Sequence, residues 1–331
     1  MIFVLFGVSL IVFYLARGFP TGIDPVTPYV NQKMTAQQIE EVRRIHGFDQ
    51  PLHIQFFYWL WDALRGDFGT TGVWANSRPA MRVFLGAFPL TVQLSSVAII
   101  LTVAIGIPLG IISAIKNNKL PDHVSRIIAL TGYSTPSYWF GFMLQLVFFY
   151  YFLVWGLPHL PSSGATGMEG AVLGVTGMPI LDGLIAGNLE YTLDALAHTI
   201  LPSFSLAFIS LGFLARIVRA SMLDVLRQDY ITLARSKGLK ERVVIYRHAM
   251  KNALIPAVTL TGIFFAALLG GAMITEYVFN WPGVGRLSLL AVFQGDSNFL
   301  LVYTLVLALI VVIANLAVDI VYVFLDPRIK Y

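Results

Sequence analysis

Five long stretches of the sequence contain no charged residue, and this feature constrains the fold more than any other. A helix that crosses a bilayer needs about 20 mostly apolar residues, because it must cover about 30 Å of hydrocarbon. The five stretches meet or approach that length. They predict membrane-spanning helices near residues 88–115, 127–157, 196–215, 253–275 and 299–325, the last of which continues beyond its uncharged stretch and includes Asp319.

The N-terminal segment, residues 1–16, predicts a sixth span. It is apolar but slightly short, and no basic residue precedes it, as one would in a secretory signal peptide. The whole chain is 57% hydrophobic and only 12% charged, which is outside the range of soluble globular proteins. We therefore predict an all-α polytopic membrane protein with six transmembrane helices.

Composition also excludes several kinds of site. No soluble basic domain is available to bind nucleic acid, although the net charge is +4. The chain contains no cysteine, so disulfides, thiolate nucleophiles and cysteine metal ligands are excluded.

Basic residues predict the orientation of the spans, because Lys and Arg concentrate in short cytoplasmic loops. The segment Lys116–Arg126 holds three of them and Arg216–Lys251 holds nine, whereas Gly156–His198 holds none. Both termini and a basic loop at residues 216–252 are therefore predicted to be cytoplasmic.

Residues 17–85 form a predicted extracytoplasmic region that precedes the main transmembrane domain, residues 86–331. Within this region "TAQQIEEVRRIHG" predicts a short helix, with Thr35 as its N-cap and Gly47 just past its end. The segment Gly156–His198 is rich in Gly and Pro and predicts a loop with at most one short amphipathic helix.

The basic loop predicts a helix, a sharp turn and a second helix. "LDVLRQDYITLARSK" has apolar residues at helical spacing, and Gly238 follows where a helix C-terminal glycine belongs. "KERVVIYRHAMKNALI" then continues as a helix into the fifth span. One interpretation is an anchor that contacts lipid head groups. The hairpin and its small residues Ala234, Ser236 and Gly238 favour instead a surface on which a cytoplasmic protein docks.

The stretch "DYITLARSKGLKERVVIYRHAMKNALIPAV" resembles the cytoplasmic coupling loop, or EAA motif, of ABC-importer permeases. Ala234, Gly238 and Pro256 match fixed positions of that motif, although Thr232-Leu233-Ala234 stands where Glu-Ala-Ala is usual. Further blocks resemble the oligopeptide/dipeptide branch and occur in its order: "GDFG", "STPSYWFG", "RHAMKNALIP", "GGAMITEYVFNWPGVGR" and "NLAVDIVYVFLDPRIK". The resemblance implies a type I ABC importer permease fold.

The resemblance implies a multi-pass subunit of the cell membrane that forms half of a pore for oligopeptides or dipeptides. The implied partners are a second related permease, two ABC ATPase subunits, an extracytoplasmic substrate-binding protein and the lipid bilayer. The chain contains no G-x-x-x-x-G-K-[ST] motif, so ATP and Mg²⁺ would belong to the ATPase subunits. This chain would hold no cofactor or metal and would catalyse no reaction.

The coupling residues that the resemblance implies all lie in the basic loop or directly after it. They are Asp229, Tyr230, Ala234, Arg235, Lys237, Gly238, Lys240, His248, Asn252 and Pro256. In that role Gly238 would supply the turn and Ala234 would let the ATPase approach closely. Arg235, Lys237 and Lys240 would offer positive charge to an acidic cleft.

Two other segments are candidates for the translocation path or its gate. "STPSYWFGF" places a proline in the third span, which predicts a kink that is either packed or lines the path. "EYVFNWPGVGR" predicts either a solvent loop whose Phe279 and Trp281 anchor in head groups, or a re-entrant element in which Glu276 binds a partner or backbone amides. The candidate residues are Tyr133, Pro136, Tyr138, Trp139, Glu276, Trp281, Pro282 and Gly283.

Other functions fit the sequence less well. A secondary transporter would need a mid-membrane carboxylate or a broken-helix ion site, and five of the predicted spans have no acid in their cores. An intramembrane hydrolase built on His198 with Ser203 or Ser205 would lack a G-x-S-x-G elbow. Among permeases of this branch, oligosaccharides and, less favoured, nickel chelates are alternative cargoes.

Overall fold

A computed structural model gives the structure of the chain and describes residues 2–18, 25–26, 29–30, 34–73, 78–270 and 272–325. The elements in chain order are α1 (Ile2–Gly18), α2 (Ala36–Ile45), α3 (Leu52–Leu64), β1 (Thr70–Thr71), β2 (Arg78–Pro79), α4 (Ala80–Ile115), α5 (Leu120–Ser134), α6 (Ser137–Gln145), the π-helix η2 (Leu146–Tyr151), α7 (Phe152–Val154), α8 (Pro179–Ile185), α9 (Leu189–Leu226), α10 (Asp229–Ser236), α11 (Glu241–Val243), the π-helix η3 (Val244–Ala249), α12 (Met250–Ala253), α13 (Ile255–Leu269), α14 (Met273–Val278), α15 (Val284–Gln294) and α16 (Ser297–Leu325). The strands β1 and β2 pair in antiparallel fashion.

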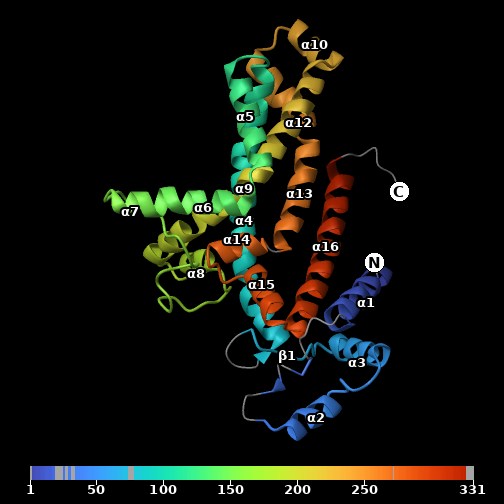
Figure 1. The fold of residues 1–331 in the computed structure, drawn as a ribbon. Coiled ribbons are helices and arrows are strands. Elements are labelled where there is room, and N and C mark those ends of the chain that lie inside the picture. The colour runs from blue at the N-terminus through green and yellow to red at the C-terminus, as the bar shows by residue number, and fades with distance from the viewer. Residues whose placement is uncertain are drawn as a thin grey trace.

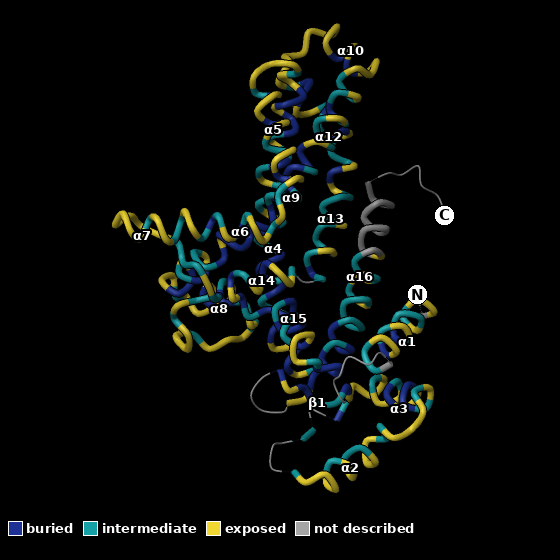
Figure 2. Tube along the Cα trace, viewed as in Figure 1, coloured by how far each residue is buried: buried dark blue, intermediate teal, exposed yellow. Residues whose placement is uncertain are grey.

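The helices α4 and α9 form the long axis of the molecule (Figure 1). α9 buries Leu211, Ala215, Val218 and Met222, which recur every three or four residues and so lie on one face of the helix. Figure 2 shows that the buried residues follow this axis, whereas α7 and the tip around α10 are largely exposed. Helix-on-helix packing therefore supplies the core, as predicted for an all-α chain.

Among the described residues, fewer than six helices are long enough to cross a membrane by themselves. Within the described residues, four helices are long and apolar enough, and a fifth results if the bent pair Glu241–Ala253 and Ile255–Leu269 counts as one span. α1 corresponds to the predicted first span at residues 1–16, but it has 17 residues where about 20 are needed. The count of six and the cytoplasmic termini stay predictions. The C-terminal residues 326–331 lie outside the described residues.

The predicted third span, residues 127–157, is not one continuous helix. α5 ends at Ser134, and Thr135 adopts an extended backbone with φ −96° and ψ 124° before Pro136 begins the next segment. The ring of a proline disfavours helical geometry in the preceding residue, which is the physical reason for the break. α5 stays beside α4 and α9, whereas α6 and α7 run sideways from them (Figure 1). The expected kink is therefore a break.

The predicted fifth span, residues 253–275, ends earlier than expected. α13 stops at Leu269, and Thr275 belongs to the separate short helix α14. The carbonyl of Gly270, left open by the end of the helix, accepts a hydrogen bond from the hydroxyl of Tyr303 at 2.6 Å. A side chain from α16 thus stabilises the end of α13.

The fourth predicted span, residues 196–215, is part of a longer helix. α9 begins at Leu189, where the Asn188 side chain caps it, and it continues to Leu226. Because the helix extends past residue 215, Arg216 and Arg219 lie on α9 and not in a loop. The helical hairpin proper is therefore shorter than the predicted loop, residues 216–252.

The described part of residues 17–85 contains α2, α3 and the two short strands. α2 was predicted correctly, with Thr35 as its N-cap, a capping box with Gln38, and Gly47 past its end at φ 66°. α4 starts at Ala80, before the predicted residue 88. The predicted loop Gly156–His198 contains one short helix, α8, before α9 begins.

Candidate functional site

The basic hairpin occupies one end of the molecule. α10 follows α9 after a short turn, and α11, η3 and α12 lead back into α13 (Figure 1). The sequence predicted this helix–turn–helix order, and the structure confirms it. The Lys and Arg residues of the hairpin are consequently presented together at the tip.

Gly238 makes the sharp turn after α10. Its φ of 75° is a left-handed conformation that glycine adopts without steric cost. The Gly238 amide donates to Arg235 O at 2.9 Å and the Leu239 amide donates to Ala234 O at 3.4 Å. These two bonds form a Schellman motif, which satisfies carbonyls at the end of the helix. The predicted C-terminal glycine is confirmed.

Ala234 faces the interior of this chain. Ile231 and Ala234 are both buried, and they belong to a cluster with Val244, Ala249 and Ala253. The small side chain of Ala234 therefore lets α10 approach the second arm of its own hairpin. The expectation that Ala234 also provides close approach for an ATPase stays a prediction, and the contacts that the structure shows for this residue are internal to the hairpin.

The outward face of α10 carries Tyr230, Leu233 and Lys237, all of them exposed. Leu233 is 57% exposed although it is apolar. The Tyr230 hydroxyl accepts a hydrogen bond from Asn252 Nδ2 at 2.9 Å, which ties α10 to α12. This face combines apolar and cationic groups, and such a mixture suits a protein partner better than lipid head groups alone.

Arg235 is engaged within the hairpin. Its guanidinium pairs with the carboxylate of Glu241 across the turn, with Nη2–Oε1 and Nε–Oε2 distances of 2.7 and 3.2 Å. The hydrogen bond from Arg235 lowers the pKa of Glu241 below its usual value. Both side chains are about half exposed, so the pair contributes little to stability. Arg235 therefore braces the turn, and its expected role of offering charge to an ATPase stays a prediction.

The other predicted coupling residues lie around the same tip. Asp229 begins α10, Lys240 precedes α11, and both are exposed. His248 is half-buried in η3, and Pro256 is exposed near the start of α13. The structure thus brings the ten predicted residues onto one hairpin and the start of the helix that leaves it.

Sequence reasoning missed a buried ion pair below the hairpin. Asp122 of α5 is fully buried and accepts hydrogen bonds from Nε and Nη2 of Arg219 at 2.7 and 2.8 Å. The carboxylate also accepts from Ser113 Oγ at 2.6 Å and from the Asn118 amide at 2.9 Å. The bonds from Arg219 hold the pKa of Asp122 well below its usual range. The available signal was an acidic residue within the segment Lys116–Arg126, which otherwise carries positive charge.

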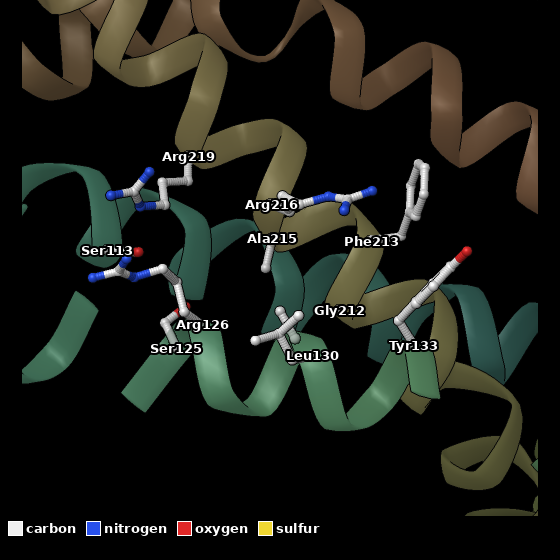
Figure 3. A pocket seen from close by; sticks show the side chains of 11 residues that line it. Ser113, Ser125, Arg126, Leu130, Tyr133, Gly212, Phe213, Ala215, Arg216 and Arg219 are labelled. Carbon is white, nitrogen blue, oxygen red and sulfur yellow. The ribbon is translucent and has the colours of Figure 1, made fainter. Parts of the chain in front are cut away.

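A groove of about 260 Å³ lies beside this ion pair, between α5 and α9. Figure 3 shows Arg126, Arg216 and Arg219 around it, with Tyr133 at one end. Each of these arginines has a local partner. Arg126 contacts His123 at 2.9 Å, Arg219 holds Asp122, and the Arg216 guanidinium lies 4.8 Å from the centroid of the Phe213 ring. Of these contacts, the Asp122–Arg219 pair attaches α5 to α9 near the end that carries the hairpin.

The aromatic candidates for the translocation path are exposed. Tyr133 is 65% exposed on α5, and Tyr138 and Trp139 are 44% and 50% exposed on α6. Pro136 lies at the break between the two helices. These four residues share the α5–α6 corner, and the structure does not bring them together with Glu276.

The second set of path candidates forms a buried cluster at α14 and the turn that leads to α15. Glu276 is fully buried and accepts hydrogen bonds from Thr91 Oγ1 and the Arg286 amide, both at 2.9 Å. Trp281 is also fully buried, and its indole N–H donates to Leu90 O at 3.1 Å. A β-carbon on Gly283 would collide with Thr91 Oγ1 and Glu276 Oε2, so only glycine fits there.

This buried cluster decides between the two interpretations of "EYVFNWPGVGR", a solvent loop and a packed element. Phe279 and Trp281 are both buried, so they are not head-group anchors on a solvent loop. Glu276 binds backbone amides, and α14 and α15 fold back against α4. Pro282, half-buried between Trp281 and Gly283, is part of the same turn. The packed alternative is the one that the structure shows.

No metal centre accompanies these features in the described parts of the chain, where no three His, Asp or Glu side chains cluster to hold an ion. The candidate functional site is the exposed face of the hairpin, which buried contacts connect to the long helices.

Comparisons with known proteins give the family. The binding-protein-dependent transport system inner membrane component family matches residues 106–331. The probable D,D-dipeptide transport system permease protein DdpB of Escherichia coli (strain K12) is 37% identical over 330 residues, which cover 99% of this chain and 94% of that protein. The dipeptide transport system permease protein DppB of Alkalihalophilus pseudofirmus is 36% identical and covers 99% of this chain and 96% of its own length.

A third relative extends the comparison to longer cargo. The oligopeptide transport system permease protein AppB of Bacillus subtilis (strain 168) is 32% identical over 329 residues, covering 99% of this chain and 96% of that protein. The matched residues include the hairpin, the α14–α15 cluster and the helices α4 and α9. The chain therefore belongs to the family of inner membrane components of binding-protein-dependent transport systems.

Proposed function

We propose that this chain forms one half of the translocation pore of an ATP-driven importer for dipeptides or oligopeptides in the cell membrane. The similarity over 99% of the chain to permeases named for dipeptides and oligopeptides is the observation that carries the proposal. Oligosaccharides and nickel chelates are not favoured, because none of these relatives is named for them.

The proposed orientation places the hairpin in the cytoplasm. Arg216–Lys251 holds nine Lys and Arg residues and Gly156–His198 holds none, which supports this side for the hairpin. Six spans with both termini in the cytoplasm follow if α1 crosses the bilayer together with the few residues that flank it. The α2–α3 region and the loop around α8 would then face outward.

The proposed partners supply the parts that this chain lacks. Two ATPase subunits would hold ATP and Mg²⁺, since the chain has no phosphate-binding loop of the P-loop type. One hairpin serves one ATPase subunit, so a second, related permease would provide the other docking site and the other half of the pore. An extracytoplasmic binding protein would deliver the cargo.

Transport would be driven through the hairpin. Closure of the ATPase subunits would push on the exposed face of α10, Tyr230 and Leu233 foremost. The cluster that contains Ile231, Val244 and Ala249 also contains Leu214 of α9, so the push would reach the long axis. The Asp122–Arg219 pair would carry α5 with α9. Buried packing transmits such a displacement because protein interiors are densely packed.

Reconstitution tests this proposal. The chain would be co-purified with the permease, ATPases and binding protein encoded beside it and placed in lipid vesicles. We expect uptake of a labelled dipeptide only with ATP and the binding protein present, and no uptake driven by an ion gradient alone. Uptake of a maltooligosaccharide without dipeptide uptake would contradict the proposed cargo. Gradient-driven uptake without ATP would contradict the mechanism.

A further inference from the structure

A second cavity, of about 380 Å³, lies at the end of the molecule opposite the hairpin. It is lined by residues of α1, α3, β1 and α16, which meet there in Figure 1. Its volume is within the range of small-molecule sites, about 300–1,000 Å³. None of the coupling or path residues discussed above lines this cavity.

Unpartnered polar atoms are concentrated around this cavity. Arg17 Nε, Gln55 Oε1, Trp59 Nε1 and Thr70 Oγ1 are buried without a hydrogen-bond partner, and all four residues line it. In the parts of the chain that the structure describes, no other buried side-chain nitrogen or oxygen lacks a partner. Gln55 is 8% exposed and Trp59 is 6% exposed. Each such group costs about 1–3 kcal/mol when it stays unpaired, so four of them in residues that line one cavity favour a polar occupant.

Arg17 provides a positive charge that has no ion-pair partner among the described residues. Its guanidinium lies 5.0 Å from the ring centroid of Phe13 and 4.9 Å from that of Phe48, and Nη2 donates to Asn298 Oδ1 at 3.2 Å. Among the described residues no carboxylate forms an ion pair with it. The rings and Asn298 therefore fix the guanidinium, and its buried Nε has no hydrogen-bond partner. A cation held in this way favours an anionic ligand.

The same lining also offers groups that accept hydrogen bonds. Gln55 Nε2 donates to Phe48 O and Gln50 O at 3.2 and 2.7 Å, which orients Oε1 as the free end of the amide. Asp62 and Asp67 add two exposed carboxylates to the lining. A simple anion would satisfy Arg17 and Trp59 but would be repelled by these acceptors.

We propose that this cavity binds a small zwitterion, a molecule with one carboxylate and one ammonium group, such as a free amino acid or a dipeptide. The carboxylate accepts hydrogen bonds from Arg17 Nε and Trp59 Nε1. The ammonium group donates to Gln55 Oε1 and is attracted by Asp62 and Asp67. Tyr58 and Phe68 provide apolar surface for a side chain. The site goes beyond the proposed function, because binding here requires no ATP, ATPase contact or binding protein.

Calorimetry on the purified complex, without ATP and without binding protein, tests the site. The probes are L-alanine and L-alanyl-L-alanine, each titrated to about 10 mM, which would saturate a site with a millimolar Kd. N-acetyl-L-alanine lacks the ammonium group and L-alaninamide lacks the carboxylate. We expect saturable binding of at least one zwitterion and at least tenfold weaker binding of both capped compounds. The two zwitterions distinguish an amino acid from a peptide.

Two variants assign the binding to this cavity. Trp59→Phe removes only the indole N–H and keeps an aromatic ring, and Arg17→Gln removes the charge. Each should weaken binding about tenfold or more, the effect of losing a hydrogen bond to a charged group. The control is Arg65→Gln, because Arg65 lies on the Trp61 ring at 4.6 Å and does not line the cavity.

Three results would overturn the inference: no saturable binding of either zwitterion, equal binding of the capped compounds, or unchanged binding in both cavity variants. If a variant fails to assemble, the capped compounds on the unaltered complex still decide. The calorimetry does not measure uptake, so absence of binding in this cavity leaves the proposed importer function intact. Likewise, absence of uptake in the reconstituted vesicles leaves binding in this cavity open to the same calorimetric test.

Discussion

Gly238 is the residue on which the turn of the hairpin depends. A β-carbon there would meet no atom within 4 Å, so a substitution acts through its φ of 75° and not through a clash. Gly238→Val should strain the turn by about 1 kcal/mol or more, because β-branched residues avoid φ > 0. We expect uptake and cargo-stimulated ATP hydrolysis to fall together while the amount of protein in the membrane stays near normal.

Gly238→Asn is the matched control for this prediction, because asparagine tolerates the left-handed region far better than valine. It should retain most of the coupling. Uptake assays on both variants measure the difference. Normal coupling in Gly238→Val would mean that the turn geometry does not matter and that the basic residues serve as a lipid anchor.

Asp122 carries a second prediction at this scale. Asp122→Asn leaves Arg219 without its counter-charge, and breaking a buried pair of this kind costs about 3–5 kcal/mol, less here because Arg219 is partly exposed. The variant complex should melt at a lower temperature than the unaltered complex. Replacing both residues, by Asp122→Asn with Arg219→Gln, should restore part of the loss. Additive losses in the double variant would show that the two residues do not interact.

The same pair predicts a pH dependence. Its contacts hold the folded-state pKa of Asp122 below the unfolded value of about 3.9. The stabilisation is therefore fully present above that value and is lost as the pH falls toward the folded pKa. The difference in melting temperature between the unaltered and Asp122→Asn complexes should stay constant from about pH 8 to about pH 5. A difference that shrinks within this range would indicate another titrating group.

Among the elements, those set by local chemistry could be predicted and those set by distant contacts could not. Thr35 with Gln38 determines the start of α2, and Gly238 determines the end of α10, so both were readable from neighbouring residues. The burial of Glu276 depends on Thr91, which is 185 residues away in the sequence. No periodicity in "EYVFNWPGVGR" reports such a contact.

α10 has two faces with different expected roles, and adjacent residues distinguish them. Ala234→Glu places a charge in the cluster with Val244 and should lower the melting temperature and the amount of assembled hairpin. Leu233→Glu changes the exposed face and should leave the melting temperature nearly unchanged while weakening ATPase binding. Thermal melting and co-purification of the ATPase subunits measure the two effects. Equal destabilisation by both substitutions would contradict the assigned faces.

At the scale of the whole molecule, orientation in the membrane can be tested directly because the chain has no cysteine. Glu169 lies in the loop before α8 and Arg227 lies at the end of α9, and both are exposed. Each is replaced by cysteine in a separate variant, Glu169→Cys and Arg227→Cys. In intact cells an impermeant thiol reagent should label the first and not the second. Labelling of Arg227→Cys alone would contradict the proposed topology and indicate the opposite orientation in the membrane.

The central claim is that the ATPase subunits act on this permease through the outward face of α10. Cross-linking in the assembled transporter tests it most directly, with single cysteines at Leu233 and at Ala234. We predict that Leu233→Cys forms a cross-link to an ATPase subunit through a short thiol–amine reagent, with a yield that changes when ATP is added. Ala234→Cys, which is buried in the hairpin, should not. The absence of any cross-link from Leu233→Cys, in a complex that still transports, would contradict the claim.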